Sequence, residues 1–180
     1  MMEQTLQDAE LLRRIATGDR DAMRLFYERH QSQLTGFIRT RGMDPATAAD
    51  VVQDAMLEVW RSASRYRGEA AAKTWLFTIA RNKIVDRTRK GARVQYMDEV
   101  PDSIDETPNP EDIAVSVSEE GRVRACLDRL KEAHKTVMRL AFYDDLTYEE
   151  IATVEDVPIG TIKTRIFHAK KLLLRCLGTR

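Results

Sequence analysis

The chain has 180 residues, 43% of them apolar, and its 29 basic and 29 acidic residues give a formal net charge of zero. This length and composition allow one good hydrophobic core or two small ones. The apolar runs are too short to span a bilayer, and the acidic N-terminus lacks the charged and then apolar pattern of an export signal. We therefore expect no membrane insertion and a cytoplasmic location.

The charge is divided unevenly among three segments. Residues 1–95 carry 17 basic and 12 acidic residues, residues 96–121 carry nine acidic and no basic residues, and residues 122–180 carry 12 basic and eight acidic residues. The middle segment also has three prolines and few large apolar side chains, so it cannot bury enough surface to offset the entropy of ordering. We expect two small domains joined by a flexible acidic linker. The linker either improves solubility or acts on a bound nucleic acid, by occupying its path or being repelled from it. The residues of the linker do not decide between these two functions.

The first segment is expected to be helical throughout. Apolar spacing over residues 6–15 predicts a short helix that ends near Gly18, and a second helix spans 21–41 and is closed by Gly42. The side chains of the second helix that we expect to face inward are Leu25, Phe26, Leu34, Phe37 and Ile38.

A third helix follows the capping pair Asp44-Pro45. Its apolar positions recur at helical spacing between Val51 and Trp60. They leave a polar, partly acidic face made by Asp50, Gln53, Asp54 and Glu58. This face is either solvated or a contact for another protein, and its composition alone does not decide.

The next segment combines cations with aromatic side chains. A helix is expected over residues 71–90, and between residues 73 and 93 seven basic residues are opposed only by Asp86. Tyr66, Trp75 and Phe77 are interleaved with these cations, although we expect part of Trp75 to join the buried stripe. Phosphates need positive charge, and each unstacked base gains about 1–3 kcal/mol from an aromatic face. The pattern is suited to single-stranded nucleic acid.

Residues 146–174 predict a helix, a tight turn and a second helix. Thr147 and Glu150 form a capping-box pattern, and Asp156 can adopt the left-handed conformation of the turn. On the second helix, Ile162, Ile166, Ala169 and Leu173 share one stripe and leave polar and cationic residues opposite. A packed helical pair with a solvated face is the alternative, but the cap, the turn and this polarity favour a helix-turn-helix that reads a major groove.

The sequence gives little sign of a disulfide, a metal site or a catalytic site. Cys126 and Cys176 lie within apolar helical spacing, so we expect reduced, packed thiols. The three histidines lack metal-ligand spacing, and no glycine-rich phosphate loop or nucleophile-base arrangement is evident. We expect no metal, no cofactor and no enzymatic activity.

Taken together, the motifs resemble those of the extracytoplasmic-function, or group IV, sigma factors of bacterial RNA polymerase. The resemblance covers nearly the whole chain and depends on the order and spacing of several short motifs. These are Asp21-Ala22 with Phe26-Tyr27, residues 49–54 through Trp60, Tyr66-Arg67-Gly68, residues 73–82 with Asp86, residues 147–152, and residues 158–165.

The resemblance implies an all-α protein with three parts: a region 2 like domain (1–95), the acidic linker (96–121) and a region 4 like domain (122–180) that contains the helix-turn-helix. The linker would pass near the polymerase active site along the RNA exit path. The residues implied in docking on the clamp helices of core polymerase are Asp50, Gln53, Asp54, Leu57 and Trp60. Those implied in opening the minus-ten element are Ser64, Tyr66, Arg67, Lys73, Trp75, Phe77, Arg81 and Asn82.

The second helix of the helix-turn-helix is similar to the family's reader of the minus-thirty-five element. Lys163, Thr164, Phe167 and His168 occupy the base-facing positions, and Arg165 and Lys171 can hold phosphates. The implied partners are core RNA polymerase, promoter DNA and an anti-sigma factor, with the free chain monomeric. Two positions depart from the family pattern: Asp156 stands where a turn glycine is more common, and Leu130-Lys131 replaces a common Leu-Pro.

Two other classes of protein remain alternatives. A stand-alone repressor or activator, dimeric on a palindromic site, would use the same helix-turn-helix but leaves the basic aromatic helix and the acidic face near Asp54 unexplained. A recombinase or resolvase needs a nucleophilic Ser or Tyr with a set of arginines, and the N-terminal half lacks a convincing strand-rich catalytic domain.

Overall fold

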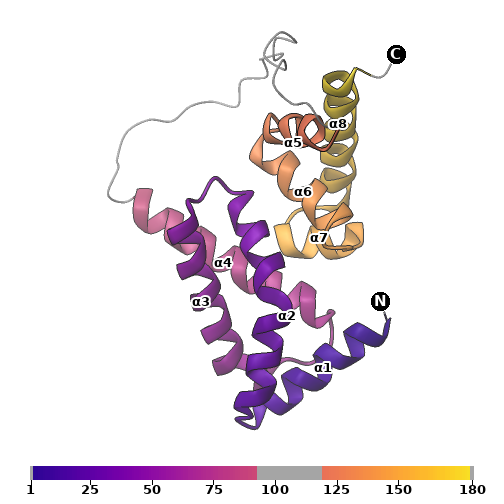
Figure 1. Cartoon of the computed structure of the whole chain (residues 1–180). Helices are drawn as coiled ribbons and strands as arrows, with labels where there is room; N and C mark the ends of the chain where they lie inside the picture. The colour runs from indigo at the N-terminus through magenta and orange to yellow at the C-terminus, as the bar shows by residue number, and fades with distance from the viewer. Residues whose placement is uncertain (1, 93–118, 179–180) are drawn as a thin grey trace.

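The computed structural model describes residues 2–92 and 119–178, and within these ranges every regular element is helical, which confirms the all-α prediction. Figure 1 shows the helices gathered in an N-terminal bundle and a C-terminal bundle. The N-terminal bundle contains α1 (Met2–Ala16), α2 (Arg20–Arg39), α3 (Pro45–Ser62), a short 3-10 turn η1 (Ala63–Arg65) and α4 (Ala72–Ala92). The C-terminal bundle contains α5 (Glu119–Asp128), α6 (Glu132–Phe142), α7 (Tyr148–Glu155) and α8 (Ile159–Leu177). Most of the expected acidic linker lies outside the described residues, and its last three positions form the start of α5.

Local side-chain chemistry sets the starts of the N-terminal helices. The Asp19 carboxylate accepts a hydrogen bond from the backbone N–H of Ala22 at 3.0 Å and so caps α2. Asp44 caps α3 in the same way, accepting from the amides of Ala46 and Thr47 at 3.0 and 3.1 Å. These bonds satisfy amides that have no partner within the first turn of a helix.

The core of the N-terminal bundle is built around aromatic rings from α2 and α4. Phe26 and Phe37 of α2 and Phe77 of α4 are fully buried, and the ring centroids of Phe37 and Phe77 lie 5.1 Å apart. The expectation that Leu25 faces inward is wrong, since this side chain is 44% exposed. The side chains of Leu25 and Phe26 point about 100° apart around the helix axis, and the face that carries Phe26 is the one that packs in the core.

The helix-turn-helix forms as its sequence predicts. Thr147 and Glu150 make the capping box, with hydrogen bonds of 3.2 Å from the Glu150 amide to the threonine hydroxyl and 2.8 Å from the Thr147 amide to the glutamate. Asp156 adopts the left-handed conformation, with φ of 57°, and ends α7. On α8, Ile162, Ile166 and Ala169 are buried.

A disulfide joins Cys126 of α5 to Cys176 of α8, with their Cα atoms 5.8 Å apart. The expectation of two reduced thiols is therefore wrong for this structure. Both cysteines do occupy packed helical positions, but the sequence does not reveal that α5 crosses the C-terminal end of α8. The bond ties the first helix of the C-terminal bundle to the last.

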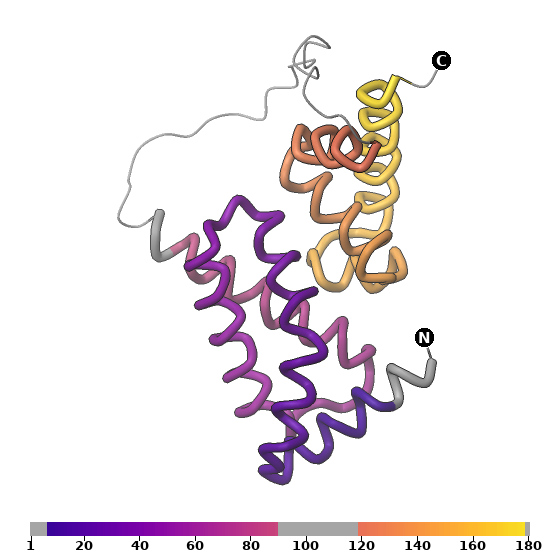
Figure 2. Tube along the Cα trace, in the orientation of Figure 1, coloured from indigo at the N-terminus to yellow at the C-terminus, as the bar shows by residue number. Residues whose placement is uncertain are grey.

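The two bundles pack against each other and share a continuous apolar core. Val137, Leu140, Ile151 and Val154 belong to the same buried cluster as the core residues of α1–α4. The main contact between the bundles is made by α7 against α4, and α6 adds a smaller contact with α2. In Figure 2 the end of the C-terminal bundle that carries α7 faces the N-terminal helices.

Candidate functional site

The polar face of α3 is accessible to solvent. Asp50, Gln53, Asp54 and Leu57 are exposed, the last by 51%, and Trp60 is half-buried. The Arg87 guanidinium of α4 lies 2.9 Å from Asp50 and 3.9 Å from Asp54, so one cation partly neutralises the two carboxylates. The structure thus brings together all five residues that were expected to dock on polymerase.

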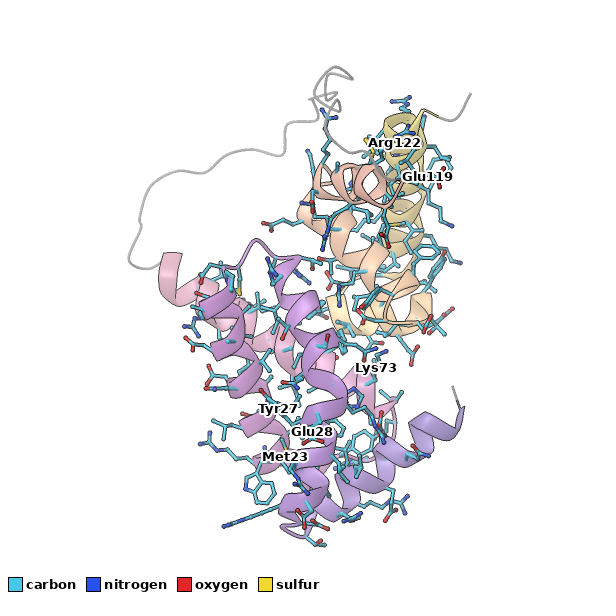
Figure 3. The ribbon with its side chains drawn as sticks, in the orientation of Figure 1. Met23, Tyr27, Glu28, Lys73, Glu119 and Arg122 are labelled. Carbon is cyan, nitrogen blue, oxygen red and sulfur yellow. A yellow bond between two sulfur atoms is a disulfide. The ribbon has the colours of Figure 1, made fainter. Side chains whose placement is uncertain are left out.

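A groove of about 540 Å³ runs between this face and α2. Its α3 wall contains Gln53, Met56, Leu57 and Trp60, and its α2 wall contains Arg20, Met23 and Tyr27. Figure 3 labels Met23 and Tyr27 on the same helix. The sequence interpretation missed the α2 wall, although the four-residue spacing of Met23 and Tyr27 places the two on one face of a helix.

The loop before α4 is held by its aromatic residue. The Tyr66 hydroxyl donates a hydrogen bond of 2.7 Å to the carbonyl of Ala70, and the Tyr66 ring lies 5.3 Å from the Trp75 ring between centroids. Burial raises the pKa of Tyr66, so the phenol stays protonated as a donor at neutral pH. Ser64 and Arg67 are exposed on the same loop. The loop therefore presents polar and cationic groups beside two partly covered rings.

On α4, the expected DNA residues separate into exposed and buried positions. Asn82 is exposed and Trp75 is half-buried, in accord with the partial burial expected for the tryptophan. Phe77 is fully buried against Phe37, so its assignment as a direct DNA contact is wrong for this structure. A ring in the core cannot stack on a base, and the role of Phe77 is to fix α4 on α2.

Two cations of α4 are already engaged by the C-terminal bundle. The Lys73 ammonium donates a hydrogen bond to the backbone carbonyl of Asp144, and burial lowers the pKa of Lys73 against the opposing effect of nearby carboxylates. The Arg81 guanidinium lies 3.4 Å from the carbonyl oxygen of Glu155 and 3.7 Å from the carboxylate of Asp156. Figure 3 shows Lys73 where the two bundles meet.

The outer face of α8 is exposed as expected. Lys163, Thr164, Phe167, His168 and Lys171 are all exposed, and Phe167 is 64% accessible. The Thr164 hydroxyl donates to the carbonyl of Gly160 at 2.9 Å, which leaves its oxygen able to accept from a ligand. Arg165 differs from the others, because it is half-buried and lies 3.9 Å from the Glu155 carboxylate.

The described side chains also bear on whether the chain holds a metal site or a membrane span. Among the described residues, no group of three or more His, Cys, Asp or Glu side chains could hold a metal ion. None of the described helices is long and apolar enough to cross a membrane.

Comparison with known proteins gives consistent matches along the chain. Residues 26–94 match the family Sigma-70 region 2, and residues 120–173 match the family Sigma-70, region 4. The chain is 33% identical to the ECF RNA polymerase sigma factor SigK of Mycolicibacterium vanbaalenii, over 93% of this chain and 88% of the relative. It is 31% identical to the ECF RNA polymerase sigma-E factor of Haemophilus influenzae, over 96% of both chains.

Two solved structures have a similar fold. One is CnrH in complex with the cytosolic domain of CnrY, with 24% identity, a TM-score of 0.65 and coverage of 95% of this chain and 97% of that one. The other is the sigma factor RpoE in complex with the anti-sigma factor NepR from Bartonella quintana, with 25% identity, a TM-score of 0.61 and coverage of 84% and 96%. Two sigma-70 regions in order, and relatives above 30% identity across almost the whole chain, establish the family: this chain belongs to the ECF sigma factors of RNA polymerase.

Proposed function

We propose that this chain is an alternative sigma factor that docks on core RNA polymerase, recognises minus-ten and minus-thirty-five promoter elements, and promotes strand opening. The proposal divides the chain into a region 2 like part (1–95), an acidic linker (96–121) and a region 4 like part (122–180). Family membership supports the activity as a whole. The individual residue roles rest on exposure and charge.

The observation that carries the proposal is the exposed groove between α2 and α3. Leu57 and Trp60 supply an apolar surface, and Asp50 and Asp54 flank it with negative charge. A large exposed apolar side chain beside carboxylates is typical of a surface that binds a basic, partly apolar helix. A helix-turn-helix repressor needs no such face, so the groove favours polymerase docking over the repressor alternative.

Strand opening is assigned to the loop before α4 and to the exposed part of α4. Ser64 and Arg67 can contact phosphate, the paired rings of Tyr66 and Trp75 offer aromatic surface, and Asn82 can hydrogen-bond a base edge. Lys73 and Arg81 can also contact DNA once they no longer bind the C-terminal bundle.

Upstream recognition is assigned to the outer face of α8. Lys163, Thr164, Phe167 and His168 present donors, an acceptor and a ring to base edges, and Arg165 and Lys171 supply charge for phosphates. The capped α7 fixes the angle of α8 through the turn at Asp156.

An anti-sigma factor is the proposed regulator, and the cytoplasm is the proposed location. A relative with the same fold, RpoE of Bartonella quintana, has been solved with the anti-sigma factor NepR. The α2–α3 groove and the exposed faces of the C-terminal bundle are the surfaces that such a partner would compete for. Polymerase is cytoplasmic, so a protein that acts with it works there.

The test is in vitro transcription with purified core polymerase and a library of genomic fragments. Core with the chain should produce transcripts from a small set of promoters that core alone does not use. Gel filtration should place the chain in the polymerase peak, and the free chain should elute as a monomer. Absence of promoter-specific transcripts, together with tight binding of a dimer to palindromic DNA, would instead establish the repressor alternative.

A further inference from the structure

Cations of α4 line one edge of the α3 face that is assigned to polymerase docking. The α3 carboxylates Asp50, Asp54 and Glu58 recur at every fourth position, so they form one stripe along the helix. Two basic residues of α4 with the same spacing lie beside this stripe. Lys83 pairs with Glu58 and Arg87 pairs with Asp50, so the two helices run in opposite directions where they meet.

The charge of the stripe is balanced at one end and not at the other. Lys83 and Glu58 form a one-to-one pair at 2.8 Å, and the hydrogen bond from Lys83 holds the pKa of Glu58 below its ordinary value. Arg87 instead serves two carboxylates, with guanidinium nitrogens 2.9 Å from Asp50 and 3.9 Å from Asp54. One cation against two anions leaves this end of the stripe with net negative charge, and Arg87 cancels half of what the two carboxylates carry.

The incompletely balanced carboxylates are the ones that a partner can reach. The side chains of Asp50 and Asp54 are 60% and 58% exposed, and Gln53 and Leu57 are exposed beside them. Arg87 lies at the rim of this surface, on the neighbouring helix. A charge at the rim of an interface acts mainly on the rate of association and on its salt dependence.

We propose that Arg87 sets how fast the docking face captures core polymerase, because it weakens the charge with which Asp50 and Asp54 attract a basic partner. This inference rests on the proposed function, which assigns the face to core docking. An alternative sigma factor shares core with other sigma factors, so the rate of capture decides how much core the chain obtains. Arg87 acts through the two carboxylates and adds little to folding, since an exposed ion pair contributes little to stability.

The first experiment measures the association and dissociation rates of the full-length chain with purified core polymerase. Arg87→Gln removes the cation and Arg87→Glu reverses it. At about 0.1 M salt, where the Debye length is about 10 Å, Arg87→Gln should raise the association rate about twofold to threefold and Arg87→Glu should raise it further. The dissociation rate should change less than the association rate does in both variants.

Arg89 provides the matched control. It is an exposed cation of the same helix, but it lies about 160° from Arg87 around the helix axis and so faces away from α3. Arg89→Gln and Arg89→Glu change the net charge of the chain by the same amounts. Their association rates should rise much less, because salt screens a charge on the far side of the helix. Thermal unfolding of all four variants checks that the fold is kept.

Salt separates an electrostatic effect from a structural one. At about 1 M salt the Debye length is about 3 Å, and the association rates of the parent and of Arg87→Gln should converge. A gain that persists at this salt would overturn the proposal. So would an equal gain in the Arg89 variants, a parent-like or slower association of Arg87→Gln, or a gain that appears only in the dissociation rate.

The second experiment measures capture directly. The parent and Arg87→Gln, carrying different labels, are mixed in equal amounts with limiting core, and the complexes are isolated before they exchange. Arg87→Gln should occupy the larger share by the same factor of about two to three, and equal shares would contradict the proposal. Failure of the proposed function looks different, because the parent chain would then neither bind core nor give promoter-specific transcripts.

Discussion

Arg87 of α4 lies 2.9 Å from Asp50 of α3, and this ion pair joins the helix assigned to strand opening to the face assigned to polymerase docking. Both residues are exposed enough for solvent to screen the pair, so its contribution to stability is small. The packing of α3 against α4 places the two surfaces side by side on one bundle, and the ion pair marks where they meet.

The docking face should respond to charge reversal at its centre. Asp54→Arg puts a cation on an exposed position next to Leu57, where a basic partner would be repelled. We expect core binding to weaken about tenfold or more, by the cost of placing like charges at an interface. Competition with the parent chain for core polymerase measures this, with thermal unfolding as the check on folding. Glu10→Arg on the exposed face of α1 is the matched control, and a mutant at position 54 that competes as well as the parent would refute the docking face.

The exposed end of the strand-opening surface should affect melting more than initial binding. Asn82→Ala and Arg67→Ala each remove one polar contact from exposed side chains, so the fold should survive. Extrusion of a base costs a few kcal/mol, and loss of a contact that offsets this cost should appear at the melting step. Permanganate reactivity of minus-ten thymines should fall while promoter retention changes little. Thr88→Ala, an exposed position on the same helix, should behave as the parent does; parent-like footprints in the two test variants would argue against the assignment.

The outer face of α8 should carry base preference. A base-edge contact is worth about 1–3 kcal/mol of discrimination, whereas a phosphate contact weakens binding to every sequence alike. Lys163→Ala and His168→Ala should relax preference at one or two base pairs, and Lys171→Ala should lower transcription from all promoters. The measurement is transcription from a library randomised in the minus-thirty-five element. An unchanged preference in the first two variants would direct attention to Phe167 and Arg165.

Asp144 should give the stability of the chain an unusual dependence on pH. The side chain is fully buried; burial raises its pKa from an ordinary 3.8 to about 6, against the opposing charges of Arg139 at 3.4 Å and of Lys73. The folded state then holds this proton more tightly than the unfolded state, so its contribution to stability is present below pH 4 and is lost as pH rises through about 6.

Asp144→Asn removes this titration and nearly preserves shape. Relative to the variant, the parent should lose about 2 kcal/mol of unfolding free energy between pH 4 and 7, out of a total of about 3 kcal/mol at about 1.4 kcal/mol for each unit of pKa. Urea unfolding at a series of pH values provides the measurement. Burial lowers the pKa of His134, so protonation of this residue destabilises the folded state as the pH falls. The effect is the same in the parent and in the variant, and it cancels from the difference between them. Parallel pH profiles would show that Asp144 does not titrate in this range.

The Cys126–Cys176 disulfide should contribute stability through the loop that it closes. With a sequence separation of 50 residues, loop-closure entropy predicts about 4 kcal/mol relative to the reduced chain. Unfolding of the oxidised chain and of the Cys126→Ser, Cys176→Ser chain measures the difference, and thiol titration of the purified protein reports how much of it is oxidised. Equal stabilities would mean that α5 is held on α8 by packing alone.

The sequence predicted those features that depend on neighbouring residues. The capping box of Thr147 and Glu150, the left-handed turn at Asp156 and the cap at Asp44 each involve groups within four positions of one another, so local chemistry determines them. The outward face of α8 followed from helical periodicity. The polar face of α3 also followed from it, because six apolar positions fixed the opposite side of the helix.

What the sequence did not predict depends on contacts across the fold. Phe77 and Leu25 are both large apolar residues, yet Phe77 lies in the core and Leu25 is exposed. Which of the two is buried depends on which helix packs against each of them. The disulfide and the contact between Thr40 and Thr136 join positions far apart in the chain. The burial of Asp144 also depends on parts of the chain that are distant in sequence. The α2 wall of the groove was missed because its residues read equally well as core.

The ion pairs of Arg41 with Glu155 and of Arg81 with Asp156 also make the contact between the two bundles depend on ionic strength. Salt screens an exposed pair more strongly than a buried one. Asp156 is largely exposed and Glu155 is buried, so added salt weakens the pair at Asp156 before it weakens the pair at Glu155. The α4 side of the contact is therefore the side that responds first to the ionic strength of the solution.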